Sequence, residues 1–250
     1  NNDQFVSYVD NDNGTLNIFF NKKQGIMTNK KMRQAVNAIV NADSVLLASY
    51  EYEELYVKSP SYMSVNNKNW FTEAGKESYN QVNPEKAKQL LEEAGYKGET
   101  IRILSTRDYD FHYNTAIIVK EELDKIGVNA EVEIYDWPTL IEKRSDPANW
   151  DILTVAFTLV TTPSQLLFFN PEYPGWIEDE KVYDLLDKVR KAEQQAEATA
   201  YWEELQEYMW NDYMPHVMFG HTSGIVATSK NLEDFRVFRG PIPWNTKVRK

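Results

Sequence analysis

The sequence has no cysteine, an excess of acidic over basic residues and no long apolar run. The lack of cysteine excludes a disulfide framework, a cysteine nucleophile and a thiolate metal site. Asp and Glu number 38 against 27 Lys and Arg, which gives a formal net charge of −11. Nucleic acid and anionic lipid both bind clustered Lys and Arg, so this balance argues against either partner. No stretch of about 18 apolar residues occurs, so we expect no membrane-spanning helix.

Sequence motifs for catalysis and cofactor binding are also missing. The chain has neither the glycine-rich loops that cradle nucleotide phosphates nor the paired-histidine motif of zinc enzymes. Its three histidines, His112, His216 and His221, do not have the spacing of metal ligands. Ser223 lies off-centre in the segment 220–224, which argues against the nucleophile elbow of serine hydrolases. We therefore expect no cofactor, no metal and no enzymatic activity. Because acidic residues abound, a glycosidase pair of carboxylates stays a distant alternative.

Helix and strand signals are clear in the middle of the chain. Asn83 and Pro84 predict a helix start, since Asn caps helix N-termini and Pro fits the first helical position. Gly95 predicts the end of this helix. Strands over 101–104 and 128–135, separated by a helical pattern, indicate a β-α-β unit whose two strands run parallel.

The rest of the chain continues the alternation of strands and helices. The almost wholly apolar run 152–157 predicts a central strand that is covered on both faces. The other expected elements are strands over 16–20, 217–219 and 225–227, helices from Thr28 to Val40 and over 137–144, and two helices after residue 178. Long irregular segments fill 50–80 and 158–178. We therefore predict an α/β fold with a mixed, mostly parallel sheet flanked by helices.

Several segments together resemble one family of proteins. The run Asn83–Tyr96 is similar to the most recognisable segment of the extracellular solute-binding proteins, family 5, of ABC transporters. The other similar segments are Phe19-Phe20-Asn21, Arg33-Gln34-Ala35, Leu123–Val128, Asp136-Trp137, Arg144, Trp202–Gln206, Pro215 and Trp244-Asn245. The resemblance covers nearly the whole chain and implies one lobe of a periplasmic-binding-protein-like fold of type II.

The resemblance also implies how the chain is divided. Members of this family close two lobes around a ligand, and the part similar to this chain is the C-terminal lobe with its hinge strands. Residues 1–20 are then expected to arrive from the N-terminal lobe through a hinge strand, residues 21–222 to form the C-terminal ligand-binding lobe, and residues 223–250 to return through the hinge and pack on the N-terminal lobe. Because the chain begins abruptly in a polar stretch, we expect it to be a fragment of a longer protein.

The positions of ligand contacts are implied by the same resemblance. Peptide-binding relatives line their site with a Trp and an Arg that match Trp137 and Arg144. The loop after the central strand matches the family's main ligand segment, and a neighbouring loop offers a cation and an aromatic face. The further expected contacts are Arg107, Tyr109, Thr158, Thr161, Thr162, Gln165 and Asn170. Peptide binders of the family usually place an Asp in this loop to pair with the ligand's amino group, but no acidic residue occurs from Ile152 to Pro171.

Two ligand classes therefore stay open. Family frequency favours an oligopeptide, whereas the neutral hydroxyl and amide side chains of the loop would suit an oligosaccharide. In either case the resemblance implies the substrate-binding component of an ABC importer, which delivers its ligand to a membrane permease. We expect a monomer outside the cytoplasm, either periplasmic or a lipoprotein anchored on the outer face of the cell membrane.

Overall fold

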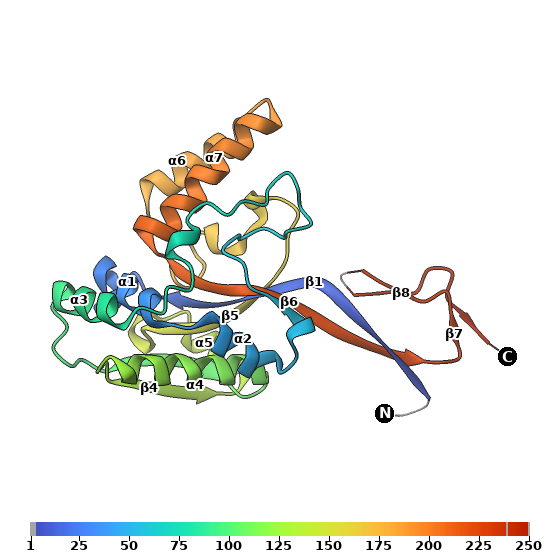
Figure 1. Cartoon of the computed structure of the whole chain (residues 1–250), viewed down its shortest axis with the longest axis horizontal. Helices are drawn as coiled ribbons and strands as arrows, with labels where there is room; N and C mark the ends of the chain where they lie inside the picture. Colours follow the sequence, from blue (N-terminus) through green and yellow to red (C-terminus); the bar gives the residue numbers. More distant parts are fainter. Residues whose placement is uncertain (1–3, 239, 250) are drawn as a thin grey trace.

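The computed structural model describes residues 4–238 and 240–249 as a helix-flanked body from which a narrow arm extends (Figure 1). The body is built on a six-stranded sheet in the order β2-β6-β1-β5-β3-β4. The strands of this sheet are β1 (Phe5–Phe20), β2 (Tyr56–Val57), β3 (Ile101–Thr106), β4 (Ala130–Tyr135), β5 (Ile152–Thr158) and β6 (His216–Ser229). The arm carries the short strands β7 (Leu232–Glu233), β8 (Arg236–Val237), β9 (Pro241–Ile242) and β10 (Lys247–Val248). The predicted α/β class with a mixed sheet is confirmed.

Helices cover the sheet, and each helix that apolar periodicity predicts is present. The α-helices are α1 (Lys30–Ile39), α2 (Ala42–Tyr50), α3 (Pro84–Ala94), α4 (Asp110–Lys125), α5 (Trp137–Lys143), α6 (Glu180–Lys191) and α7 (Gln195–Tyr208). The α6–α7 hairpin projects from the side of the sheet opposite α4 (Figure 1).

Capping residues set the ends of α3 as their sequence predicts. Asn83 accepts a hydrogen bond from a backbone N–H of the first turn at 3.0 Å, and Gly95 ends the helix in a left-handed conformation with φ of +75°. The start of α1 differs from the prediction by one residue. Asn29, not Thr28, is the cap, because the Asn29 side chain accepts a backbone hydrogen bond at 2.9 Å. The Thr28 hydroxyl instead donates to a carbonyl of the preceding turn.

The pairing of the strands confirms the β-α-β unit and corrects the balance of the sheet. β3 pairs in parallel with both β4 and β5. The other three pairings, β1 with β5, β1 with β6 and β2 with β6, are antiparallel. Two of the five pairings are therefore parallel, fewer than the predicted majority. The physical reason is that β1 and β6 pair with each other over most of their length and place an antiparallel ribbon in the middle of the sheet.

β1 and β6 are both longer than their apolar segments predict. β1 begins at Phe5 instead of residue 16, and β6 runs without interruption through the two predicted strands, 217–219 and 225–227. Beyond the body the two strands continue as an antiparallel ribbon that leads into the arm (Figure 1). Periodicity misses this ribbon because polar residues interrupt the alternation that marks a half-buried strand.

A bulge marks the place where the ribbon leaves the body. The three residues 11–13 of β1 lie opposite a single residue of β6, Ser223. Next to this bulge, a Cβ atom added to Gly14 would lie 2.5 Å from the carbonyl oxygen of Phe157 on β5. Only glycine permits such a close approach of two backbones. The bulge and this glycine together redirect β1 out of the body.

Buried polar side chains join segments that are distant in the sequence. The Asn21 amide donates to the carbonyls of Pro147 and Trp150 at 2.6 and 2.8 Å. Arg33 is 4% exposed. Its guanidinium donates to the backbone carbonyls of Met27, Thr28, Tyr213 and Met214, at 2.7–3.0 Å. Arg33 therefore ties the start of α1 to the segment that follows α7.

An aromatic cluster in the core contains polar atoms without hydrogen-bond partners. Tyr62 is 1% exposed, stacks on Trp210 with ring centres 5.8 Å apart, and lies 5.0 Å from the ring of His216. Within the described residues, the Tyr62 hydroxyl and both ring nitrogens of His216 have no hydrogen-bond partner. Because an unpaired buried polar group costs about 1–3 kcal/mol, these atoms lower the stability of the fold.

Tyr62→Phe is therefore expected to leave the free energy of unfolding unchanged or to raise it by up to about 1 kcal/mol, since it removes an unpaired hydroxyl. Urea denaturation followed by circular dichroism measures the change. Tyr79→Phe is the matched control, because the Tyr79 hydroxyl donates to the Phe219 carbonyl, and its removal should cost about 1 kcal/mol. A loss of more than about 1 kcal/mol for Tyr62→Phe would mean that this hydroxyl has a partner, such as a buried water.

Candidate ligand-binding site

A hollow of about 380 Å³ lies beyond the carboxyl end of β5, between α5 and the loop that follows β5. Four of the predicted contacts line it together: Trp137, Arg144, Thr158 and Gln165. The other lining residues are His112, Leu140, Thr154, Val155, Ala156, Phe157, Val160, Leu166, Leu167 and Tyr173. Ligands of open α/β sheets bind at the carboxyl ends of the strands, so this hollow occupies the expected place for a binding site.

Arg144 contributes a positive charge to this hollow. Its Nη1 atom lies 3.5 Å from the Tyr173 hydroxyl, at the outer limit of a hydrogen bond, and its Cζ atom lies 5.5 Å from the centre of that ring. The Arg144 Nε atom is buried and has no hydrogen-bond partner among the described residues. Burial raises the pKa of Tyr173, so this ring stays a neutral hydroxyl donor. Arg144 therefore retains unused hydrogen-bonding capacity.

Trp137 is half-buried and is held in place by aromatic and polar neighbours. Its backbone N–H donates to Asp108 Oδ2 at 2.6 Å, which fixes the first residue of α5. The rings of Tyr109 and His112 lie 5.2 and 5.8 Å from the Trp137 ring. Tyr109, a predicted contact, thus supports Trp137 edge-on and does not itself line the hollow. The exposed part of the Trp137 ring can stack on a ligand.

His112 and Tyr173 line the hollow although their sequence positions did not single them out as ligand contacts. His112 is 3% exposed, and its Nδ1 atom lies 3.2 Å from Thr154 Oγ1. Burial, and to a lesser extent the charge of Arg144, lower the pKa of His112 to about 4 against an opposing hydrogen bond to Thr154. This imidazole is therefore neutral at pH 7. The proximity of His112 to Arg144 depends on how α4 packs beside β5, which no local pattern encodes.

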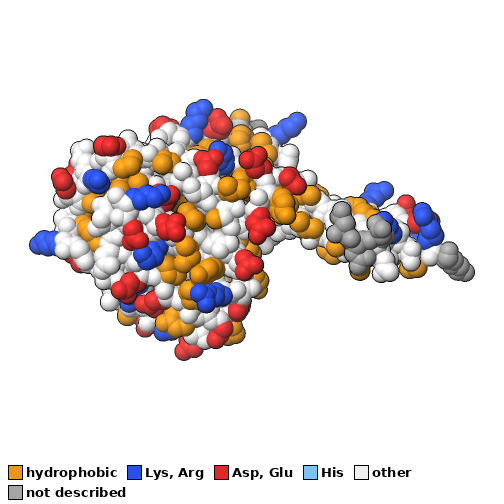
Figure 2. Space-filling model, turned by 60° about the horizontal axis from the view of Figure 1, so that its bottom comes forward, with side chains coloured by type: hydrophobic (Ala, Val, Ile, Leu, Met, Phe, Trp, Pro, Cys, Tyr) orange, Lys and Arg blue, Asp and Glu red, His pale blue; other side chains and the backbone are white. Residues whose placement is uncertain are grey.

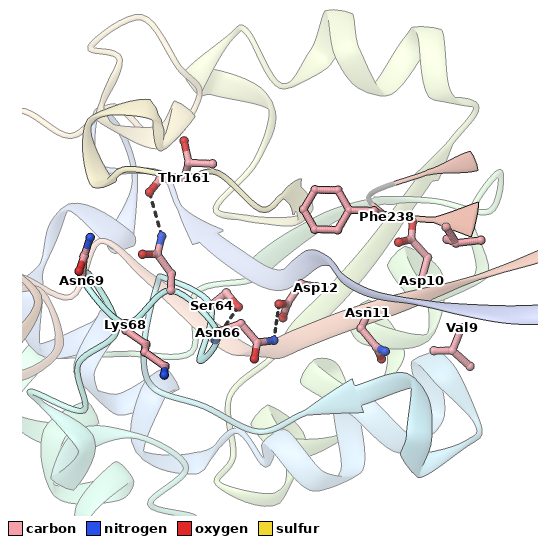
Figure 3. A pocket seen from close by; sticks show the side chains of 12 residues that line it. Val9, Asp10, Asn11, Asp12, Ser64, Asn66, Lys68, Asn69, Thr161 and Phe238 are labelled. Atoms are coloured by element: carbon pink, nitrogen blue, oxygen red, sulfur yellow. Dashed lines mark hydrogen bonds between the residues drawn. The ribbon is translucent and has the colours of Figure 1, made fainter. Parts of the chain in front are cut away.

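A second hollow, of about 750 Å³, lies between the β1 bulge and a loop over 64–69 (Figure 3). Half of its lining residues carry amides or hydroxyls, and the others are Asp10, Asp12, Lys68, Val9, Val237 and Phe238. Of the predicted contacts it contains only Thr161. Asn67 donates to the Thr161 carbonyl at 2.8 Å, and Asn66 donates to Asp12 at 2.6 Å (Figure 3). The sequence gives no signal for this hollow, because its walls come from segments about 50 to 100 residues apart.

The remaining predicted contacts lie elsewhere. Asn170 lines a hollow of about 480 Å³ against α6, where Gln165 also lies. The guanidinium of Arg107 lies over the Tyr113 ring, 4.7 Å from its centre. The backbone N–H of Thr162 donates to Gln165 Oε1, so both residues hold the turn after β5. The predicted contacts are thus divided among several places in the structure.

Within residues 4–238 and 240–249, no cluster of three or more His, Asp or Glu side chains is arranged to hold a metal ion. Across the same described residues, no helix has the length and apolar character to cross a membrane.

Comparison with known proteins identifies relatives of the chain. The family model for bacterial extracellular solute-binding proteins, family 5 (middle region), matches residues 1–180. A probable peptide ABC transporter periplasmic-binding protein, y4tO of Sinorhizobium fredii (strain NBRC 101917 / NGR234), is 32% identical over 249 residues, which cover 92% of this chain and 45% of that protein. The oligopeptide-binding protein AppA of Bacillus subtilis (strain 168) is 23% identical over 240 residues, covering 88% and 43%.

Solved structures show the same fold. AppA from Bacillus subtilis in complex with a nonapeptide superimposes with a TM-score of 0.83 at 19% identity, over 99% of this chain and 53% of that one. A dipeptide-binding protein from Pseudoalteromonas sp. SM9913 in complex with Met-Leu gives 0.83 at 20% identity, over 99% and 51%. The chain spans about half the length of these relatives. Because the family model covers most of its residues, the chain belongs to the bacterial extracellular solute-binding proteins of family 5.

Proposed function

We propose that this chain is the C-terminal lobe of the substrate-binding component of an ABC importer, which captures a peptide between two lobes and passes it to a membrane permease. The observation that carries the proposal is the hollow at the end of β5, where Trp137 and Arg144 face a common space. Family membership and the peptide-binding names of the relatives support it. The proposed protein catalyses no reaction, needs no cofactor, and acts as a monomer outside the cytoplasm, in the periplasm or anchored by lipid.

The arm supports a division of the chain into a lobe and a hinge. We propose that residues 1–20 arrive through the hinge, that 21–222 form the lobe, and that 223–250 return to the other lobe; residues 1–3, 239 and 250 lie outside the described part. On the face that Figure 2 shows, apolar side chains extend to the neck of the arm. The large exposed apolar side chains of the ribbon and arm include Phe5, Val9, Ile225, Phe238 and Trp244, which are 43–80% exposed. Such a set is typical of a surface that another domain covers.

Trp137→Ala in the full-length protein is expected to weaken peptide binding about 10-fold to 100-fold, because it removes an aromatic wall of the hollow. Isothermal titration with alanine peptides of two to six residues measures the dissociation constants. Tyr201→Ala is the matched control, since Tyr201 lies on α7 away from the hollow and packs with Lys188. An affinity that Trp137→Ala leaves unchanged would remove this residue from the site.

An oligosaccharide is a second candidate ligand. The hollow of about 750 Å³ favours it, because its wall offers the amides of Asn11, Asn66, Asn67 and Asn69, which suit hydroxyl groups (Figure 3). Thermal-shift screening of the full-length protein with peptides and with oligosaccharides separates the two classes, since a ligand that binds only the folded state raises the melting temperature. A melting temperature that rises with oligosaccharides but not with peptides would contradict peptide capture.

A further inference from the structure

A small cavity lies between α1, α3 and the segment after α7, at the end of the body remote from the arm (Figure 1). Its volume is about 190 Å³. At roughly 30 Å³ per water this is room for about six waters, so only a small molecule fits. The cavity shares no lining residue with the three hollows described above. It is therefore a separate place in the fold.

The backbone beside this cavity is strained. Met214, which lines it, has φ of +48°, and Val82, next to the lining residue Gln81, has φ of +46°. Such left-handed conformations are rare for residues other than glycine and most unfavourable for β-branched ones. Met214 also follows a π-helix, Met209–Tyr213, that forms part of the same wall. Irregular backbone of both kinds is concentrated at functional sites of proteins, which makes this cavity a candidate.

The lining of the cavity carries one positive charge without a counter-charge. Lys86 lies in the first turn of α3, and its ammonium donates to Gln81 Oε1 at 2.7 Å. No ion pair among the described residues involves Lys86, and none of the lining residues is acidic. Lys31, the other lysine of the lining, pairs with Glu93 at 2.7 Å. The Lys86 ammonium therefore favours an anionic group in the cavity.

Amide side chains in the wall have unused hydrogen-bonding capacity. The Asn37 amide donates to the Ser78 carbonyl at 2.8 Å, but its buried Oδ1 atom has no hydrogen-bond partner among the described residues. The Gln34 amide reaches the Asn211 carbonyl only at 3.5 Å, the outer limit of a hydrogen bond. A buried acceptor without a donor is unfavourable. A bound molecule that brings a hydroxyl group would supply the donor that Asn37 lacks.

The remaining wall of the cavity is apolar. Leu90, Trp210 and Met214 are buried and face it. Apolar side chains contact hydrocarbon favourably, whereas an inorganic anion such as phosphate has no hydrocarbon to place against them. A small organic anion therefore matches this wall better than an inorganic one.

We infer that this cavity is an accessory site for a small hydroxycarboxylate, separate from the hollow at the end of β5. The carboxylate pairs with Lys86, the hydroxyl donates to Asn37 Oδ1, and the short carbon skeleton packs on Leu90 and Trp210. The inference goes beyond the proposed function and does not depend on peptide capture, because the two sites share no residue.

The test follows the Met214 methyl group by NMR in the full-length protein labelled with ¹³C at its methionine methyl groups. Met214 lines the cavity, and Met214→Leu assigns its signal. Lactate should shift this signal saturably. Propionate, which lacks the hydroxyl, should bind about 5-fold more weakly, and lactamide, which lacks the charge, at least about 10-fold more weakly. Inorganic phosphate should bind more weakly than lactate.

Variants of two lysines on one helix connect the binding to the cavity. Lys86→Gln should weaken lactate binding about 10-fold, because it removes the charge that holds the carboxylate. Lys88→Gln is the matched control, since Lys88 is also exposed on α3 but does not line the cavity. It should bind lactate like the wild type. Thermal unfolding of each variant verifies that it is folded.

The outcomes separate this inference from the proposed function. A Met214 signal that lactate leaves in place, equal binding of lactate and propionate, or tighter binding of phosphate would overturn the inference. An unchanged lactate affinity in Lys86→Gln would overturn it as well. Excess tetraalanine should not reverse the lactate-induced shift, and displacement would mean that the sites are not separate. Peptide capture is measured independently, through Trp137→Ala, and stands in each of these cases.

Discussion

Arg33→Met is expected to lower the free energy of unfolding by roughly 3–5 kcal/mol. Methionine keeps the apolar stem but removes every donor of the guanidinium. Four backbone carbonyls then lose their hydrogen bonds, and each costs about 1 kcal/mol or more where water cannot replace the donor. The contact between the start of α1 and the segment after α7 depends on these hydrogen bonds, so their loss should detach the two segments from each other.

Urea denaturation measures this loss, with Arg190→Met as the matched control. Arg190 lies exposed near the end of α6, so its replacement should change the free energy of unfolding by less than about 0.5 kcal/mol. Arg33→Lys should fall between these two variants, because one ammonium group cannot reach all four carbonyls. A loss below about 1 kcal/mol for Arg33→Met would mean that water or a neighbouring donor satisfies the carbonyls.

Lowering the pH from 7 to 5 is expected to reduce the free energy of unfolding by about 2 kcal/mol through His112 alone. The pKa of His112 is about 4 in the folded chain and about 6.5 when unfolded. The unfolded chain therefore binds a proton below pH 6.5 that the folded chain does not accept until the pH approaches 4. This stability is complete above pH 6.5 and is lost as the pH falls. Burial also lowers the pKa values of His216 and His221, which act in the same direction.

Urea denaturation at pH 7, 6 and 5 for the wild type and for His112→Gln isolates this contribution. Glutamine does not titrate, so the variant should lose less stability on acidification than the wild type by about 2 kcal/mol. Carboxylates titrate in both proteins, so their contribution to the pH dependence of the free energy of unfolding cancels when the two proteins are compared. An equal pH dependence in the two proteins would mean that His112 titrates normally and is solvated in the folded state.

The candidate site could be predicted from the sequence only in part. Trp137 and Arg144 are seven positions apart on one short helix and its end, so a family pattern that names both already places them on one side of α5. Thr158 and Gln165 join them because β5 ends beside that helix. Thr161 is only three residues after Thr158 but lines the hollow of about 750 Å³, because the chain turns there and the Thr161 carbonyl accepts a hydrogen bond from Asn67.

What the sequence determined by itself is local. The ends of α3 are set by Asn83 and Gly95, and the presence of strands β3 and β5 follows from their apolar residues, because caps and periodicity act over a few residues. The tertiary structure alone decided that β1 extends through polar residues into a ribbon, and that Arg144 meets no counter-charge among the described residues. The ribbon joins segments from opposite ends of the chain, and the hollow around Arg144 joins segments spread over residues 112–173. Backbone pairing or burial between such segments leaves no pattern in either segment alone.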